Sequence, residues 1–341
     1  MPQQVPHKVV VTGASGNVGT SVVEALGRSD EVSEIVGVAR REPSWHPPKT
    51  TWVTADVARD DLTEVFTGAD VVIHLAWFFQ PTSEPMTTWN VNVRGSIRVF
   101  DAAVRSGVGA LVVASSVGAY SPGPEDGHLV DESWPTDGWA PAAYTREKAY
   151  VERVLDTVEA THSQLRVVRM RPAFMFKRTS ASSQRRIFMG PFLPRRLVQP
   201  GLVPVVPDLP GLRFQALHSD DAAEAYVAAT VRPVHGAFNV GGDDVLDAEA
   251  LRQILGARAT VPVHPRLART ALGTLWRLRA VPAPPDLLDA FLHLPVMDDS
   301  RARRDLGWSP RYTAADTLRE FLQGLYDGSG AATAPLEPDN A

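Results

Sequence analysis

The stretch KVVVTGASGNVG, residues 8 to 19, decides how this chain folds. It opens with a run of β-branched residues, Val9 to Thr12, which is typical of a short strand buried in a parallel sheet. Glycines follow with the spacing GxxGxxG, and after them TSVVEALGRS places its apolar residues on one helical face. A strand, a glycine-rich turn and a helix therefore follow one another directly.

A strand, a glycine-rich turn and a helix in this order can form a dinucleotide-binding site. Gly13 permits the tight turn, Gly16 lets the backbone approach a pyrophosphate, and Gly19 lets the helix pack close to the strand. The helix N-terminus offers free N–H groups and a positive dipole end to the phosphates. The alternative is a loop that is rich in glycine only for turning. The flanking strand and helix favour the nucleotide site.

Composition narrows the class of protein. The chain has 341 residues, 44% of them hydrophobic and 21% charged, which is typical of a globular chain with a large core and two lobes. The net charge of -5 gives no general attraction to nucleic acid or to a membrane. No apolar run reaches the roughly 18 residues that span a bilayer, and MPQQVPHK has no signal core. We therefore expect a cytoplasmic protein that acts on a small molecule.

Cysteine is absent and the nine histidines show no ligand spacing, so we expect no disulfide and no metal site. In the second predicted strand, EIVGVARR, the position that binds the adenosine ribose is Ala39, followed by Arg40 and Arg41. An acid at this position favours NAD, whereas an arginine suits the 2′-phosphate of NADP. We expect NADP rather than NAD, unless both arginines are only solvated surface charges.

Further strands are predicted near residues 50–57, 71–77, 110–120 and 165–172, and they alternate with helices. This alternation predicts an α/β fold with a doubly wound parallel sheet, in which ligands lie beyond the carboxyl ends of the strands. Ala76, Ser116 and Pro172 are at such ends.

The segment YTREK carries the chemistry. On a helix, Tyr144 and Lys148 lie one turn apart on the same face. A tyrosine is a poor acid–base group near neutral pH, and a neighbouring ammonium favours its phenolate form. A hydroxyl of Ser115 or Ser116 would hold a substrate carbonyl oxygen beside it. The alternative is an ordinary helix face.

With TGASGNVG, HLA (74–76), SSVGAY (115–120), YTREK, RMRP (169–172) and HSDDAAEAY (218–226), the chain resembles the extended short-chain dehydrogenase/reductases, or NAD-dependent epimerase/dehydratase family. The pattern is nearest to the NADP-linked, reductase-like members. The resemblance implies a Rossmann domain with a smaller C-terminal substrate lobe, and it is compatible with a homodimer. It implies that Ser116, Tyr144 and Lys148 are catalytic. The implied cofactor contacts are Gly13, Ser15, Gly16, Asn17, Val18, Gly19, Arg40, Asp56, Val57, Leu75, Ala76, Tyr144, Lys148 and Pro172.

The sequence departs from the sugar-nucleotide epimerases of this family. Their diphosphate-binding arginine is displaced by one residue in RFQALHSDD, and RPAFMF lacks their asparagine after the sixth strand. Trp77 and Phe78 follow HLA, and Phe174 lies in RPAFMF; we expect these three aromatic residues to contact an apolar substrate, with core packing as the alternative.

We expect residues 1–172 and 214–241 to form the dinucleotide-binding domain, 173–213 and 242–326 the substrate lobe, and 327–341 a disordered tail. The amphipathic stretch ARTALGTLWRLRAV is expected to make a core or subunit contact rather than a membrane contact. The function expected is NAD(P)-dependent hydride transfer on a small or medium carbonyl or alcohol. The alternatives are a sugar-nucleotide epimerase or dehydratase with tightly bound NAD, and a non-catalytic nucleotide sensor.

Overall fold

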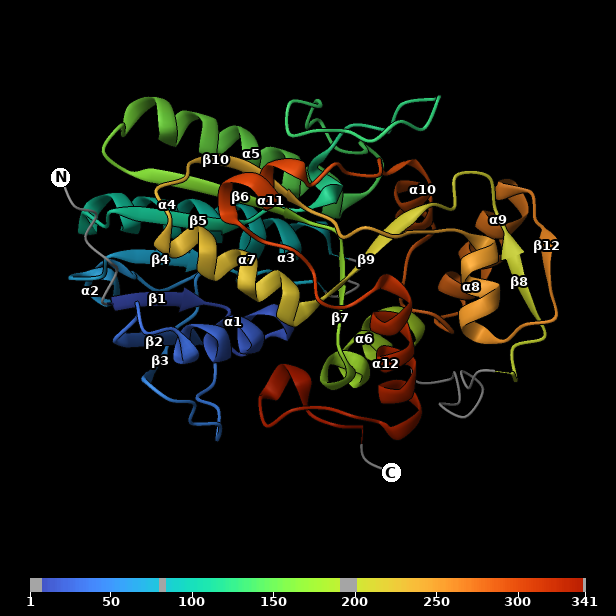
Figure 1. Cartoon of the computed structure of the whole chain (residues 1–341), viewed down its shortest axis with the longest axis horizontal. Coiled ribbons are helices and arrows are strands. Elements are labelled where there is room, and N and C mark those ends of the chain that lie inside the picture. Colours follow the sequence, from blue (N-terminus) through green and yellow to red (C-terminus); the bar gives the residue numbers. More distant parts are fainter. Residues whose placement is uncertain (1–7, 80–83, 191–200, 340–341) are drawn as a thin grey trace.

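Seven parallel strands form the central sheet of the protein (Figure 1), in the order β10-β6-β5-β4-β1-β2-β3. The computed structural model describes residues 8–79, 84–190 and 201–339. The strands are β1 (Lys8–Thr12), β2 (Glu34–Ala39), β3 (Thr50–Thr54), β4 (Val71–His74), β5 (Ala110–Ala114), β6 (Arg166–Pro172) and β10 (Gly236–Val240). The predicted doubly wound parallel sheet is confirmed.

Helices cover both faces of this sheet. On one face pack α1 (Asn17–Arg28), α7 (Ser219–Val231) and α11 (Ser300–Leu306), and on the other α2 (Thr63–Phe66), α4 (Gly95–Ser106) and α5 (Ala143–Thr161). Alternate residues of β1 serve the two cores: Val9 and Val11 pack towards α1, whereas Val10 packs towards α4. A strand buried on both faces explains the uninterrupted run of valines in the sequence.

The remaining elements gather beside the carboxyl ends of the central strands (Figure 1). One small sheet joins β7 (Phe174–Phe176), β9 (Phe214–His218) and β11 (Val245–Leu246), and another joins β8 (Val205–Asp208) and β12 (Ala259–Pro262). The helices here are α3 (Pro85–Thr88), α6 (Ala181–Gln184), α8 (Ala248–Leu255), α9 (Pro265–Arg277), α10 (Pro285–His293) and α12 (Ala314–Asp327). Within residues 214–241, which are expected to belong to the dinucleotide-binding domain, β10 joins the main sheet, whereas β9 pairs with β7 and β11.

The segment after α12 is packed rather than disordered, so this expectation was wrong for residues 328–339. Thr333 and Leu336 are almost completely buried, and Thr333 Oγ1 donates a 2.8 Å hydrogen bond to the carbonyl oxygen of Ser15. The Asp339 carboxylate accepts from Arg185 Nε at 2.7 Å and from Arg186 Nη1 at 2.8 Å. A buried leucine and these polar contacts order a segment whose composition is polar and small.

In the part of the chain that the structure describes, no helix combines the length and the apolar character needed to cross a bilayer.

Candidate active site

The glycine-rich turn has the shape that its sequence predicts. Gly13 has a positive φ of 73°, and a Cβ there would lie 2.6 Å from the backbone nitrogen of Ala76. A Cβ at Gly19 would collide with the carbonyl oxygen of Gly13. Gly16 is the N-cap residue of α1 and makes no side-chain hydrogen bond, so no side chain of the cap residue satisfies the first N–H groups of the helix. The turn therefore fits an anionic group, as a pyrophosphate site requires.

Tyr144 and Ser116 meet at the carboxyl end of β5. The Tyr144 hydroxyl donates to Ser116 Oγ at 2.9 Å, and Ser116 Oγ also accepts from the backbone nitrogen of Gly118 at 2.9 Å. Ser115 is turned away, because its Oγ donates to Glu152 at 2.5 Å. The geometry thus selects Ser116 rather than Ser115 as the partner of Tyr144.

Lys148 lies one turn further along α5 and is 4% exposed. Its Nζ donates to the carbonyl oxygen of Ala114 at 2.7 Å. Burial lowers the pKa of Lys148 to about 7, although the carboxylates of Glu152 and Glu147 act in the opposite direction.

Burial also raises the pKa of Tyr144 to about 12, and the hydrogen bond to Ser116 offsets only part of this effect. The expectation that Lys148 depresses this pKa is not met in this conformation, because desolvation dominates and the ammonium hydrogen bonds to Ala114. Tyr144 therefore carries its proton at neutral pH.

Aromatic side chains pack around the Tyr144 ring. Trp77 and Phe79 both make edge-on contacts with the Tyr144 ring, at centroid distances of 6.0 and 4.8 Å. Phe188, from the π-helical turn Arg185–Met189, packs on Phe79 at 5.3 Å. The Phe78 ring instead lies 6.0 Å from the Arg40 guanidinium. Of the residues predicted to contact substrate, Trp77 thus packs against Tyr144. Phe79, rather than its neighbour Phe78, is the second aromatic residue that contacts Tyr144.

A buried asparagine, which sequence reasoning missed, holds the aromatic loop. Asn92 accepts from the backbone nitrogen of Phe78 at 2.7 Å and donates to its carbonyl oxygen at 3.1 Å. Its Nδ2 also donates to Glu147 at 2.7 Å. Asn92 lies in the π-helical turn Trp89–Arg94, and such turns are frequent at functional sites. The sequence signal at this position is the motif NVRG, residues 92–95, which begins with Asn92.

The other predicted cofactor residues line the same edge of the sheet. Arg40 is exposed directly after β2. Val57 is buried against the start of α4, and the Asp56 carboxylate accepts from the backbone nitrogen of Ala58. Leu75 follows β4 and its backbone nitrogen donates to Thr12, while Pro172 ends β6. Ser15 and Val18 lie in the turn, but the Asn17 amide donates to Met175 and accepts from Ser219, which is a structural role.

Phe174 does not belong to the aromatic group around Tyr144. It lies in a second aromatic cluster. Its ring is 5.7 Å from that of Phe214 and 5.2 Å from that of Phe291. Gln215, next to Phe214, is buried, and its amide bonds to Gly242 and Met297. Arg213 donates to the carbonyl oxygen of Gly127, at 3.4 Å. The segment that departs from the epimerase pattern is therefore apolar and internally bonded.

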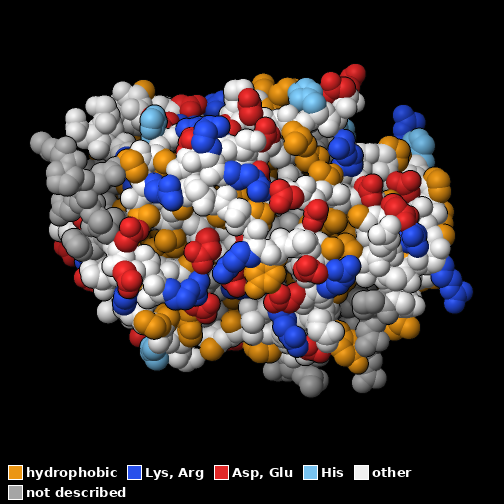
Figure 2. All heavy atoms as spheres, in the orientation of Figure 1, with side chains coloured by type: hydrophobic (Ala, Val, Ile, Leu, Met, Phe, Trp, Pro, Cys, Tyr) orange, Lys and Arg blue, Asp and Glu red, His pale blue; other side chains and the backbone are white. Residues whose placement is uncertain are grey.

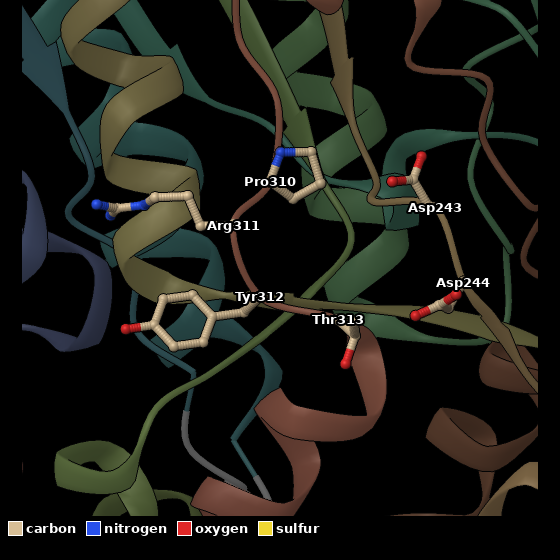
Figure 3. A pocket seen from close by; sticks show the side chains of 6 residues that line it. All are labelled: Asp243, Asp244, Pro310, Arg311, Tyr312 and Thr313. Atoms are coloured by element: carbon tan, nitrogen blue, oxygen red, sulfur yellow. The ribbon is translucent and has the colours of Figure 1, made fainter.

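A pocket of about 120 Å³ lies apart from these residues (Figure 3). Its lining is Asp243, Asp244, Pro310, Arg311, Tyr312 and Thr313. The charged groups in it already have protein partners: Asp243 pairs with Arg303, Asp244 accepts from the backbone of Ala314, and Arg311 pairs with Asp221. Among the described residues, no group of three or more acidic or histidine side chains could hold a metal ion.

The chain belongs to the NAD dependent epimerase/dehydratase family, whose sequence profile matches residues 9–241. This assignment agrees with the Rossmann fold and with the Ser116, Tyr144 and Lys148 geometry described above.

Individual relatives are distant. An uncharacterized protein of Mycobacterium tuberculosis is 24% identical over 332 residues, which cover 94% of this chain and 85% of that protein. An L-arabinose 1-dehydrogenase (NAD(P)(+)) of Haloferax volcanii is 36% identical over 110 residues, 32% of this chain and 41% of that enzyme. The crystal structure of a Thermus thermophilus UDP-glucose 4-epimerase complexed with NAD superposes with a TM-score of 0.68 at 20% identity, covering 93% of this chain and 98% of that one. The last likeness concerns the fold alone.

Proposed function

We propose that this chain is an NAD(P)-dependent oxidoreductase that prefers NADPH and acts on a small or medium, largely apolar carbonyl or alcohol. The observation that carries the proposal is the 2.9 Å hydrogen bond between Tyr144 and Ser116, with Lys148 one turn away on α5. A bound nicotinamide would supply or accept the hydride, and the chain supplies positioning and the proton.

The two hydroxyl groups define where the substrate oxygen binds. Ser116 and Tyr144 would both donate to a carbonyl oxygen placed between them, which polarises the carbonyl and orients its carbon. Because the pKa of Tyr144 is raised to about 12, the hydroxyl is protonated near neutral pH and can transfer its proton to the developing alkoxide. The aromatic cover of Trp77, Phe79 and Phe188 would exclude water during this step.

The glycine turn and the strand ends would hold the cofactor. The uncapped start of α1 would face the pyrophosphate, and Lys148 would bind the nicotinamide ribose. Arg40 is exposed where an adenosine 2′-phosphate would lie, which supports NADPH over NADH.

The apolar surroundings support an apolar substrate rather than a nucleotide sugar. The resemblance implies that sugar-nucleotide enzymes of this family bind a diphosphate with an arginine near the position of Phe214 and contact the substrate with an asparagine near that of Phe174. Here these two rings pack on each other and on Phe291. A sugar-nucleotide epimerase or dehydratase is still the second candidate, since the Thermus thermophilus structure named above is a UDP-glucose 4-epimerase.

A substrate screen separates these functions. Ketones, aldehydes and nucleotide sugars are incubated with NADPH or NADH, and the absorbance of the reduced cofactor is followed. Oxidation of NADPH by an apolar carbonyl is the expected result. NAD that copurifies with the protein and does not exchange, with turnover of a nucleotide sugar, would establish the epimerase instead. Cofactor binding without turnover of any compound would favour a nucleotide sensor.

A further inference from the structure

The end of the molecule formed by β8, β12 and α9 exposes an unusual amount of apolar surface. Seven of the thirteen large hydrophobic side chains that are exposed among the described residues lie in these elements or at their ends. They are Leu202, Val205, Val261, Leu267, Leu275, Trp276 and Leu278. This end projects away from the central sheet (Figure 1). Scattered exposed leucines need no explanation, but such a concentration does.

The apolar residues of α9 form a stripe on the side that faces away from the protein. Leu267, Ala271, Leu275 and Leu278 are spaced by four, four and three residues, so they lie along one face of the helix. Leu267 is 69% exposed and Leu278 is 72% exposed. None of the residues of α9 is buried. Of the two contacts expected for this stretch, a core contact is therefore wrong for the stripe, whereas a subunit contact stays a prediction.

The segment that runs from β12 through α9 is basic. Residues 258–279 contain five arginines and no aspartate or glutamate, in a chain whose net charge is -5. Arg269 is neutralised by Asp286 and Asp289 of α10. Across residues 8–79, 84–190 and 201–339, no ion pair is formed by the other four: Arg258, Arg266, Arg277 and Arg279. Figure 2 shows Lys and Arg side chains projecting beside hydrophobic ones at this end of the molecule, together with a group of Asp and Glu side chains.

We propose that α9 docks this end of the protein on an anionic membrane surface, with Leu267, Leu275 and Leu278 inserted between the headgroups. An interfacial helix needs an apolar face for the acyl boundary and cations for the phosphates, and α9 offers both. Arg266 and Arg277 lie together on one side of the stripe, about a quarter-turn from Leu267 on the helix, where they would meet headgroup phosphates. This proposal replaces the expectation that the protein binds no membrane, and it does not depend on the proposed reaction.

The charge of α9 favours an anionic membrane surface over a second copy of the chain as its partner. A twofold contact brings the same patch of each copy together, so it would place the unpaired arginines of one copy against those of the other. An anionic bilayer presents the opposite charge. The docking would be peripheral, because α9 has only 13 residues and lies on the outside of the fold.

The proposal is tested by cosedimentation of the full chain with vesicles. One set of vesicles contains phosphatidylcholine alone, and the other contains equal parts of phosphatidylcholine and phosphatidylglycerol. Two double variants are compared with the parent: Leu267→Ser with Leu278→Ser, and Arg277→Gln with Arg279→Gln. Leu129→Ser is the matched control, since Leu129 is 51% exposed on a different part of the chain.

The expected result is binding to the phosphatidylglycerol vesicles that falls at high salt, is about tenfold weaker in each double variant, and is unchanged in the control. Binding that the double variants leave unchanged, or no binding to either set, would overturn the proposal. So would a dimer in light scattering that the double leucine variant dissociates, since a second copy would then cover the stripe. Melting temperatures equal to that of the parent establish that the variants fold.

Discussion

The indole ring of Trp77 lies over the ammonium group of Lys148, with 3.5 Å between Nζ and the ring centroid. Such cation–π contacts are worth about 2 kcal/mol when they are removed from water. Trp77 thus stabilises a lysine whose charge is otherwise disfavoured by burial.

The proton transfer assigned to Tyr144 predicts a specific defect. Tyr144→Phe removes only the hydroxyl, so turnover should fall by about 10²–10⁴-fold, which is the usual contribution of positioned acid–base catalysis. Affinity for NADPH, measured by fluorescence titration, should stay the same. Tyr150→Phe is the control, because Tyr150 lies on the same helix and is 45% exposed. Turnover of Tyr144→Phe within a few-fold of the parent would contradict the mechanism.

Lys148 should make stability depend on pH. Its pKa is about 7 in the folded protein against an ordinary value of 10.5. Between these values the unfolded chain holds a proton that the folded chain lacks, so the free energy of unfolding should rise with pH by up to about 1.4 kcal/mol per unit. Lys148→Met should lack this rise. Urea denaturation of both proteins from pH 7 to pH 10 measures the difference, and parallel pH profiles would refute the assignment.

Phe79 and Phe78 are neighbours with different expected roles. Phe79 contacts Tyr144, whereas the Phe78 ring lies near Arg40. Phe79→Ala should therefore raise KM for an apolar carbonyl substrate while NADPH affinity is retained. Phe78→Ala should leave that KM unchanged. If instead Phe79→Ala lowers the melting temperature sharply and keeps a normal KM, the ring belongs to the core and not to the substrate site.

Cofactor preference rests on Arg40. Arg40→Ala should weaken NADPH binding by roughly 1.5–3 kcal/mol, as expected for the loss of a charged hydrogen bond, and should leave NADH nearly unaffected. Isothermal titration with both cofactors measures this directly. An equal loss for NADPH and NADH would show that Arg40 does not contact the 2′-phosphate.

Asn92 should matter for the fold of the aromatic loop. Asn92→Ala leaves the backbone groups of Phe78 and the buried Glu147 carboxylate without this partner, which should cost about 1–3 kcal/mol of stability. Asn90→Ala is the matched control, because Asn90 lies in the same π-helical turn but is exposed. Equal melting temperatures for the two variants would rule out the bridging role.

The parts of the site that follow from local pattern could be predicted from the sequence. The glycine turn depends on residues 13 to 19, and Tyr144 and Lys148 depend on the spacing of one helix. The choice between Ser115 and Ser116 needed the structure, because it depends on which hydroxyl reaches Tyr144 and which reaches Glu152.

Contacts between distant segments could not be predicted in this way. Phe188 reaches Phe79 from far along the chain, and Asn92 and Glu147 are 55 residues apart. No spacing or repeat in the sequence links the members of either pair, so a single sequence does not reveal these contacts. The packing of residues 328–339 was missed for a similar reason: a polar composition predicts disorder, but the burial of Leu336 and Thr333 depends on surfaces built by other elements.

The hydrogen bond from Thr333 to Ser15 joins residues 318 positions apart. Because synthesis runs from the N-terminus, the glycine turn is made long before Thr333. A nascent chain that has already formed β1 and α1 must therefore wait until these further residues are made before this contact closes. The carbonyl group of Ser15 thus obtains its partner late in cotranslational folding, although the turn around it can form early.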